Sequence, residues 1–144
     1  LRFGRYADSV AGYTAALAAA NASDQRLPSP RRPGLRAATI LPWLGEALAS
    51  SNRLEEAVAA NTEGRDRLRE FLAREPYLVS ARRQLAYASS NAARIAEARW
   101  DFAAAEAAGR EAQDCYEQIL KLDPDNTSAL NNLSLVYGGR ARTA

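Results

Sequence analysis

The sequence contains no histidine and no methionine, and its single cysteine is Cys115. Without histidine, and with only one thiol, the usual ligand sets for zinc, copper and haem iron are missing. The missing imidazole also removes the usual base of a nucleophilic catalytic site, and there is no phosphate-binding glycine loop or Gly-x-Ser-x-Gly turn. These absences favour a protein that is not an enzyme and that has neither a cofactor nor a metal site.

Long apolar runs and a strong excess of one charge are absent as well. No uninterrupted apolar run approaches the roughly 18 to 20 residues of a membrane span, and the N-terminus does not have the layout of a signal peptide. The formal charge is +2, from 19 basic and 17 acidic residues, so neither nucleic acid nor membrane insertion is expected. The compartment is unknown from the sequence, and the cytoplasm is favoured over the periplasm.

What is present is alanine, arginine and a helical rhythm. Only Lys121 is a lysine, and this bias towards arginine and alanine is typical of a high-GC bacterial gene. Apolar and small residues recur at steps of three and four, as on one face of an α-helix, whereas strand-like alternation is absent. The pattern predicts an all-α fold of about six antiparallel helices, over residues 5–22, 35–51, 53–74, 77–99, 101–122 and 127–138.

Capping and breaking residues set several of these boundaries. Asp101 is a predicted N-cap, and the helix that it opens stops before Pro124. Asn52, followed by Glu55 three residues later, has the pattern of an N-cap with a carboxylate that reaches back. Pro42 must either kink its helix or begin it, and a kink is favoured.

The helices repeat with a period of 48 residues. Three sets of landmarks show this spacing: Tyr6, Leu54 and Phe102; Ser9, Ala57 and Ala105; Pro28, Pro76 and Pro124. A period of this length built from helices is typical of a solenoid, in which each unit packs on its neighbours. We therefore expect residues 1–144 to form one helical-repeat domain. Because the sequence does not begin with Met and starts just before a second helix, we also expect it to be part of a longer array.

Three passages resemble the tetratricopeptide repeat (TPR), a helix-turn-helix unit. GRYADSVAGYTAAL resembles the second helix of the family, LPWLGEALASSNRLEEA the turn between helices, and LKLDPDNTSALNNLSLVYG the junction into the next repeat. The matching positions are Gly4, Tyr6, Ser9, Tyr13, Ala16 and Leu17; Leu41, Leu44, Gly45, Leu48, Leu54 and Ala57; and Leu120, Asp123, Pro124, Ala129, Leu130, Leu133 and Tyr137.

The resemblance implies a right-handed superhelix with a concave face that binds peptides. The chain departs from the family in length, because the usual unit has about 34 residues. The additional residues amount to about four helical turns shared between two helices, and whole heptads nearly preserve the buried face. Long repeats of this kind are similar to the arrays attached to bacterial signalling proteins.

Two functions follow from this resemblance. The first is a protein–protein interaction scaffold that binds a peptide or protein segment in a concave groove, as the regulatory or interaction part of a larger bacterial signalling protein. The alternative is a structural module that assembles with copies of itself through end helices whose apolar faces are uncovered.

The groove of a TPR-like fold is lined by the first helix of each pair, which directs attention to residues 77–99. Beside the apolar stripe of this helix, polar residues recur at intervals of four, four and three positions and form a strip. With the equivalent position one repeat later, the candidate peptide-binding residues are Arg83, Tyr87, Asn91, Arg94 and Asn131. Guanidinium groups, an aromatic ring and amides suit an acidic extended segment. The alternative is that the two arginines only solvate the helix or pair with nearby acids.

Three further residues have both a packing and a functional interpretation. Cys115 lies on an apolar helix stretch and is expected to be a small packing residue rather than a reactive thiol. Trp43 and Trp100 are expected at helix turns, where each indole wedges between helices, with ligand stacking as the alternative.

Overall fold

The computed structural model describes residues 2–26, 32 and 34–143. This part of the chain contains six α-helices and no strand, so the predicted all-α class is confirmed. The helices are α1 (Arg2–Arg26), α2 (Leu35–Ser50), α3 (Leu54–Arg74), α4 (Val79–Ala98), α5 (Phe102–Leu122) and α6 (Thr127–Thr143). The four inner helices lie within two residues of the predicted boundaries.

The two end helices are longer than predicted. α1 continues to Arg26, whereas the prediction ended at residue 22. α6 continues through Gly138 and Gly139, at which the prediction ended it. A glycine lowers helix stability by about 1 kcal/mol without forbidding the helix, so the prediction that the pair stops α6 was wrong. Pro28, and most of the predicted connection around it, lie outside the described residues.

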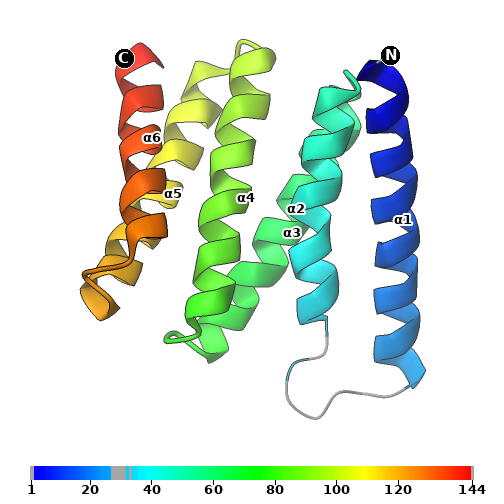
Figure 1. The fold of residues 1–144 in the computed structure, drawn as a ribbon, viewed down its shortest axis with the longest axis horizontal. Helices are drawn as coiled ribbons and strands as arrows, with labels where there is room; N and C mark the ends of the chain where they lie inside the picture. The colour runs from blue at the N-terminus through cyan, green and yellow to red at the C-terminus, as the bar shows by residue number, and fades with distance from the viewer. Residues whose placement is uncertain (1, 27–31, 33, 144) are drawn as a thin grey trace.

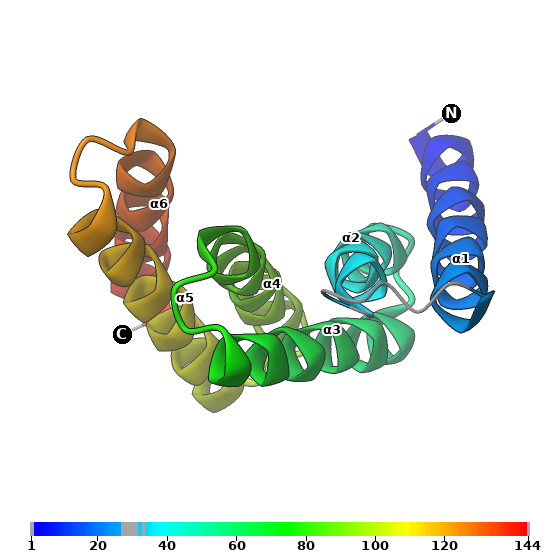
Figure 2. The same ribbon diagram turned by 90° about the horizontal axis from the view of Figure 1, so that it is seen from below.

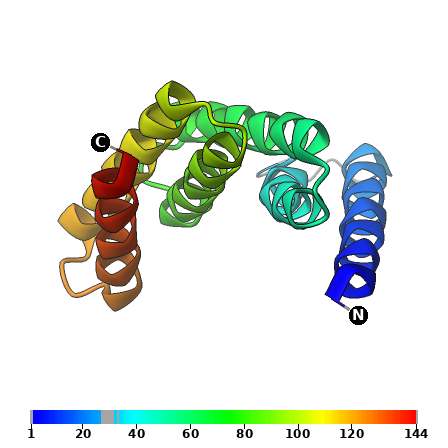
Figure 3. The same ribbon diagram turned by 90° about the horizontal axis from the view of Figure 1, so that it is seen from above.

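The helices form two rows on a curve (Figures 1, 2 and 3). Each helix packs on the next in the chain, and α2 also contacts α4. Seen from either end of the helices, α3 and α5 lie on the outer side of the curve, and α2, α4 and α6 lie towards its inner side (Figures 2 and 3). α1 and α6 lie at opposite ends.

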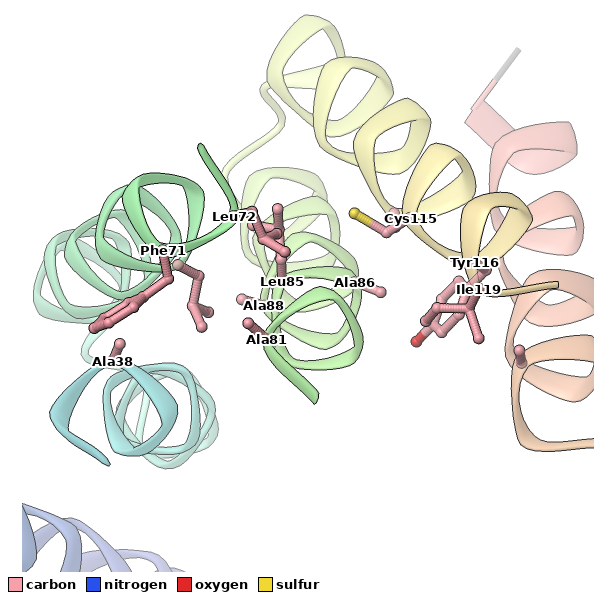
Figure 4. Close-up of a cluster of buried hydrophobic side chains, with 13 residues drawn as sticks. Ala38, Phe71, Leu72, Ala81, Leu85, Ala86, Ala88, Cys115, Tyr116 and Ile119 are labelled. Atoms are coloured by element: carbon pink, nitrogen blue, oxygen red, sulfur yellow. The ribbon is translucent and has the colours of Figure 1, made fainter. Parts of the chain in front are cut away.

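The main core runs between the rows, from α2 to α6 (Figure 4). On the α2–α3 side, Phe71 lies over Ala38, and on the α5 side Tyr116 and Ile119 point inward (Figure 4). Many of the buried side chains are alanine, which lets the helices approach closely. The closest approach is at Gly64, where an added Cβ would come 2.8 Å from Cδ of Pro42. Larger side chains are therefore excluded from the contact between α2 and α3.

The turns after α2 and after α4 have the same geometry. Asn52 and Trp100, which are 48 residues apart, have φ values of 60° and 59°. In each turn the residue after the left-handed one donates its N–H to a carbonyl oxygen of the preceding helix. Arg53 donates to the Leu48 carbonyl at 2.9 Å, and Asp101 donates to the Ala96 carbonyl at 2.9 Å. This is the Schellman arrangement. Asn52 therefore ends one helix and is not the N-cap of the next, so that prediction was wrong.

Other predicted boundary features have mixed outcomes. Asp101 caps α5 by accepting a hydrogen bond from the Ala104 N–H at 3.1 Å, as predicted. Pro42 lies inside α2, buried, and does not begin it. The expectation that an indole wedges between helices was wrong for Trp100, which is 80% exposed. Trp43 lies within α2 and not at a turn, but its ring does pack against Tyr87 of α4.

Ion pairs join α3 to α5. Glu111 of α5 accepts hydrogen bonds from Arg65 at 2.5 Å, from Arg69 at 2.7 Å and from the Ser89 hydroxyl at 2.7 Å. Burial acts to raise the pKa of Glu111, but the hydrogen bonds from Arg69, Ser89 and Arg65 outweigh burial and lower this pKa to about 2. Glu111 is therefore ionised at neutral pH and links the pair α4–α5 to α3 of the preceding pair α2–α3.

Candidate binding surface

The five predicted site residues lie on α4 and α6, and three of them line the cavity described below. Arg83 and Asn131 are exposed, and neither lines the cavity described below. Tyr87 and Arg94 lie on the inner side of α4 together with Asn91. Asn91 is only 1% exposed, whereas the polar strip was predicted to face solvent. Its burial results from neighbouring helices, which a pattern along one helix does not show.

A chain of contacts fixes the inner residues of α4 against α2. The ring of Tyr87 stacks on Trp43, with centroids 4.4 Å apart. The Tyr87 hydroxyl donates to Glu46, which also accepts from Arg94 at 3.1 Å. Arg94 further donates to Oδ1 of Asn91. Burial, and then the bond to Glu46, raise the pKa of Tyr87 well above its ordinary value, so the phenol remains a donor. These side chains are held in place before any ligand binds.

A cavity of about 400 Å³ is lined by residues of α4, α5 and α6. α4 contributes Tyr87, Asn91 and Arg94, α5 contributes small residues such as Gly109, and α6 contributes the side chain of Leu135 among others. α2 and α4 touch directly, whereas α4 and α6 make no comparable helix–helix contact. Along the inner side of the curve, α2 and α4 are therefore in contact, whereas a cavity separates α4 from α6.

The Nδ2 atom of Asn91 is buried and makes no hydrogen bond of normal geometry among the described residues, although the Asn91 amide lies near the Tyr87 hydroxyl and acts to lower the pKa of Tyr87. The orientation of the amide follows from its other end, because Oδ1 accepts from Arg94. An unpaired buried donor costs about 1–3 kcal/mol. Nδ2 has almost no accessible surface, so a carbonyl or carboxylate oxygen of a ligand in the cavity would relieve this cost only if the Asn91 side chain turned towards it.

The α6 side of the cavity carries a second arginine. Arg140 donates to Glu106 at 2.7 Å and also to Gln113. Its side chain lies over Gly109, where an added Cβ would come 3.2 Å from Cγ of Arg140. Arg94 and Arg140 thus border the cavity from α4 and α6, with Glu97 as its lining acid. Both arginines already pair with acids, Arg94 with Glu46 and Arg140 with Glu106, so the cavity carries no excess of positive charge.

Several residues of this surface were not predicted from the sequence. Trp43 and Glu46 precede Asn91 and Arg94 by 48 residues, and Leu135 follows Tyr87 by 48. Each therefore occupies the place on its own helix that a predicted residue occupies on α4. Applying the period to every member of the strip would have found all three.

The described side chains offer neither a metal site nor a reactive thiol. In the described part of the chain, no three His, Cys, Asp or Glu side chains come together as a possible metal site. Cys115 is buried, as predicted, and burial raises its pKa to about 11, which keeps the thiol protonated. Among the described helices, none combines the length and apolar character needed to cross a bilayer.

The chain was compared with protein-family models, curated proteins and solved structures, and no match was found in any of the three. Its function is therefore inferred from its own residues and geometry.

Proposed function

We propose that this chain is a non-catalytic, TPR-like interaction scaffold that binds an extended protein segment along the inner side of its curve. In this proposal the six helices wind into a right-handed superhelix, and the array serves as the interaction part of a larger bacterial signalling protein. The 48-residue repeat of helix pairs and the matching turns at Asn52 and Trp100 support the repeat architecture.

The observation that carries the proposal is the unpaired Nδ2 of buried Asn91 beside a cavity of about 400 Å³. A peptide backbone supplies carbonyl acceptors at regular intervals, so an extended segment laid across α4 provides the missing partner. Peptide binding also suits a surface that is fixed in advance, because little side-chain entropy is lost when the ligand docks.

The surroundings of Asn91 define the class of segment. Arg94 keeps a side chain that is 63% exposed although it pairs with Glu46, so it can also contact a ligand carboxylate. Leu135 is 72% exposed and offers an apolar contact on the opposite wall. We therefore expect a segment in which an acidic residue lies next to an apolar one.

The test is binding to an array of short synthetic peptides, half with acidic residues and half with the corresponding amides. The wild-type protein should bind a subset of acidic peptides, and Arg94→Gln should weaken that binding by about tenfold, the loss of one charged hydrogen bond. The matched control is Arg67→Gln, because Arg67 also makes a surface ion pair, with Glu63, but lies on α3 and does not line the cavity. Equal binding to acidic and amide peptides, or equal effects of the two variants, would contradict the proposal.

A further inference from the structure

Another cavity lies between α2 and α4, on the side of the Trp43–Tyr87 stack that is nearer to the starts of the two helices. Its volume is about 350 Å³. Gln84 lies seven residues, or about two turns, before Asn91, so this cavity also opens on the inner side of the curve. None of its lining residues is acidic: Arg32, Leu35, Arg36, Thr39, Ser80, Ala81 and Gln84.

Arg36 of α2 differs from the other arginines at such cavities, because no carboxylate pairs with it. Six arginines line four of the cavities in the described part of the chain: Arg32, Arg36, Arg65, Arg94, Arg99 and Arg140. Glutamate side chains pair with five of them. The Arg36 side chain is exposed and makes neither an ion pair nor a hydrogen bond among the described residues. Its guanidinium therefore keeps all its donors for a ligand.

Arg32 borders the same cavity but contributes little net charge. Its Nε and Nη2 atoms donate to the carboxylate of Glu75, at 3.1 Å and 2.8 Å. The pair is neutral as a whole, so the positive charge of the cavity is that of Arg36. The Nη1 atom of Arg32 makes no hydrogen bond among the described residues and remains a donor.

Polar side chains of α4 face Arg36 across the cavity. Ser80 is exposed, and its hydroxyl makes no hydrogen bond among the described residues. The buried Oε1 of Gln84 has no partner either, so no hydrogen bond fixes this amide, and its Nε2 can turn towards an anion. The Thr39 hydroxyl is already engaged, because it donates to the Arg36 carbonyl at 2.8 Å. α4 therefore adds two donors to those of Arg36.

The first turn of α4 adds to this positive surface. Ser80 and Ala81 belong to that turn, whose N–H groups have no acceptor within the helix. No side chain caps α4, and its first turn contains no acid. By contrast, Asp101 caps α5 and Asn126 caps α6. The start of a helix carries a partial positive charge, so it reinforces the preference of Arg36 for an anion.

We propose that the cavity between α2 and α4 binds a phosphoryl group, with Arg36 donating from one helix and Ser80 and Gln84 from the other. A phosphoryl group has three strong acceptor oxygens and a charge between about −1.5 and −2 at pH 7, so it accepts from both helices at once. This site shares no lining residue with the cavity at Asn91. The inference is therefore independent of the proposed peptide binding.

The test is an NMR titration of the ¹⁵N-labelled protein with inorganic phosphate, in a phosphate-free buffer of low ionic strength. The backbone signals of Ser80 and Ala81 should shift and reach saturation. Acetate at the same ionic strength should shift them much less, because a carboxylate has fewer oxygens and a single charge. Shifts that do not saturate, or equal shifts with acetate, would overturn the proposal.

A phosphoserine peptide and its unphosphorylated form distinguish the two sources of a phosphoryl group. If a phosphorylated protein segment is the source, the phosphoserine peptide should shift the same signals at a lower concentration than inorganic phosphate does. If the free ion is the source, the two should bind alike. Equal binding of the phosphorylated and unphosphorylated peptides at these signals would contradict a phosphoryl site.

Variants of exposed arginines test the role of Arg36. Arg36→Gln should weaken phosphate binding by about tenfold or more, the loss of a charged hydrogen bond. The matched control is Arg5→Gln, because Arg5 is also exposed and makes no ion pair among the described residues, but lies on α1. It should bind phosphate like the wild type. Circular dichroism should show unchanged helix content in both variants, and equal affinities of Arg36→Gln and the wild type would show that the site is wrong.

Discussion

The first and second junctions between helix pairs are built at equivalent positions from different chemistry. In the first junction, which joins α1, α2 and α3, Val10, Tyr13 and Leu17 of α1 pack against a buried cluster that includes Leu44 and Leu48 of α2. The space between the helices is filled with apolar side chains.

The second junction, which joins α3, α4 and α5, has a cavity of about 140 Å³ at the corresponding place. Ala92 and Ala96 stand where the first junction has Leu44 and Leu48, and Arg65 stands where it has Leu17. In addition to the main core that runs through these helices, this junction is held by the hydrogen bonds to Glu111.

The comparison shows that the 48-residue period fixes the spacing of helices but not the interaction that stabilises each junction. Apolar burial depends little on pH or salt, whereas partly exposed ion pairs depend on both. The first junction should therefore be sensitive to loss of volume, and the second to loss of charge.

The largest expected effect comes from exchanging the leucine of one junction with the alanine of the other. Leu44→Ala should lower the free energy of unfolding by about 2–5 kcal/mol, because it leaves a cavity in a filled cluster. Ala92→Leu adds the same atoms beside an existing cavity and should leave stability unchanged or raise it by about 1 kcal/mol. Chemical denaturation measures both. Similar losses in the two variants would mean that both junctions are packed alike.

The next effect concerns Ala57 and Ala105, which are equivalent and both buried. Ala57→Leu should cost about 1–3 kcal/mol, because α2 and α3 leave no room for a larger side chain. Ala105 borders the cavity between α4 and α6, so Ala105→Leu should cost less than about 1 kcal/mol. Urea unfolding of the two variants measures the difference in their free energies of unfolding. A greater loss of stability in Ala105→Leu than in Ala57→Leu would contradict this prediction.

A smaller effect is the pH dependence of the second junction. The pKa of Glu111 is lowered from 4.5 to about 2 in the folded protein, so its contribution is complete above pH 4.5 and is lost as the pH falls towards 2. The full shift corresponds to about 3.4 kcal/mol at 1.36 kcal/mol per pH unit. Solvent screening of this partly exposed group reduces the contribution to about 1–2 kcal/mol.

Glu111→Gln should therefore be less stable than the wild type at pH 6 and nearly equal to it at about pH 2. The control is Glu70→Gln, because Glu70 is exposed and its carboxylate makes no ion pair among the described residues. A stability difference between Glu111→Gln and the wild type that stayed the same from pH 6 to pH 2 would show that charge is not what Glu111 contributes.

The smallest effect is that of salt. At about 1 M NaCl the ion pairs around Glu111 are screened. The free energy of opening measured by amide hydrogen exchange in α5 should therefore fall by less than about 1 kcal/mol. Exchange in α2, within the apolar junction, should not become easier. Equal changes in both helices would argue against different stabilising interactions.

These differences show which parts of the structure can be predicted from the sequence. Local signals were sufficient for the inner helices, because periodicity defines their length and residues such as Asp101 cap them. Asn52 was misassigned because asparagine suits both an N-cap and a left-handed helix end, and its φ of 60° in the structure separates the two.

The site was less predictable than the helices. The period and the polar strip identified Tyr87, Asn91 and Arg94, all of which border the cavity. The burial of Asn91 was not predicted, because it depends on how α2 and α6 are placed around α4. Glu46 was missed for a different reason, because the period was applied only to Arg83, although Glu46 precedes Arg94 by 48 residues.

The most direct test of the proposed groove is the NMR signal of the Asn91 side-chain amide during titration with a peptide selected from the array. If a peptide carbonyl fills the missing hydrogen bond, this signal should shift strongly, together with backbone signals of the inner sides of α4 and α6. The Asn61 side chain, which already donates to the Ala88 carbonyl at 3.0 Å, should shift little. Shifts confined to α3 and the outer side of α5, with the Asn91 amide unchanged, would contradict binding on the inner side of the curve.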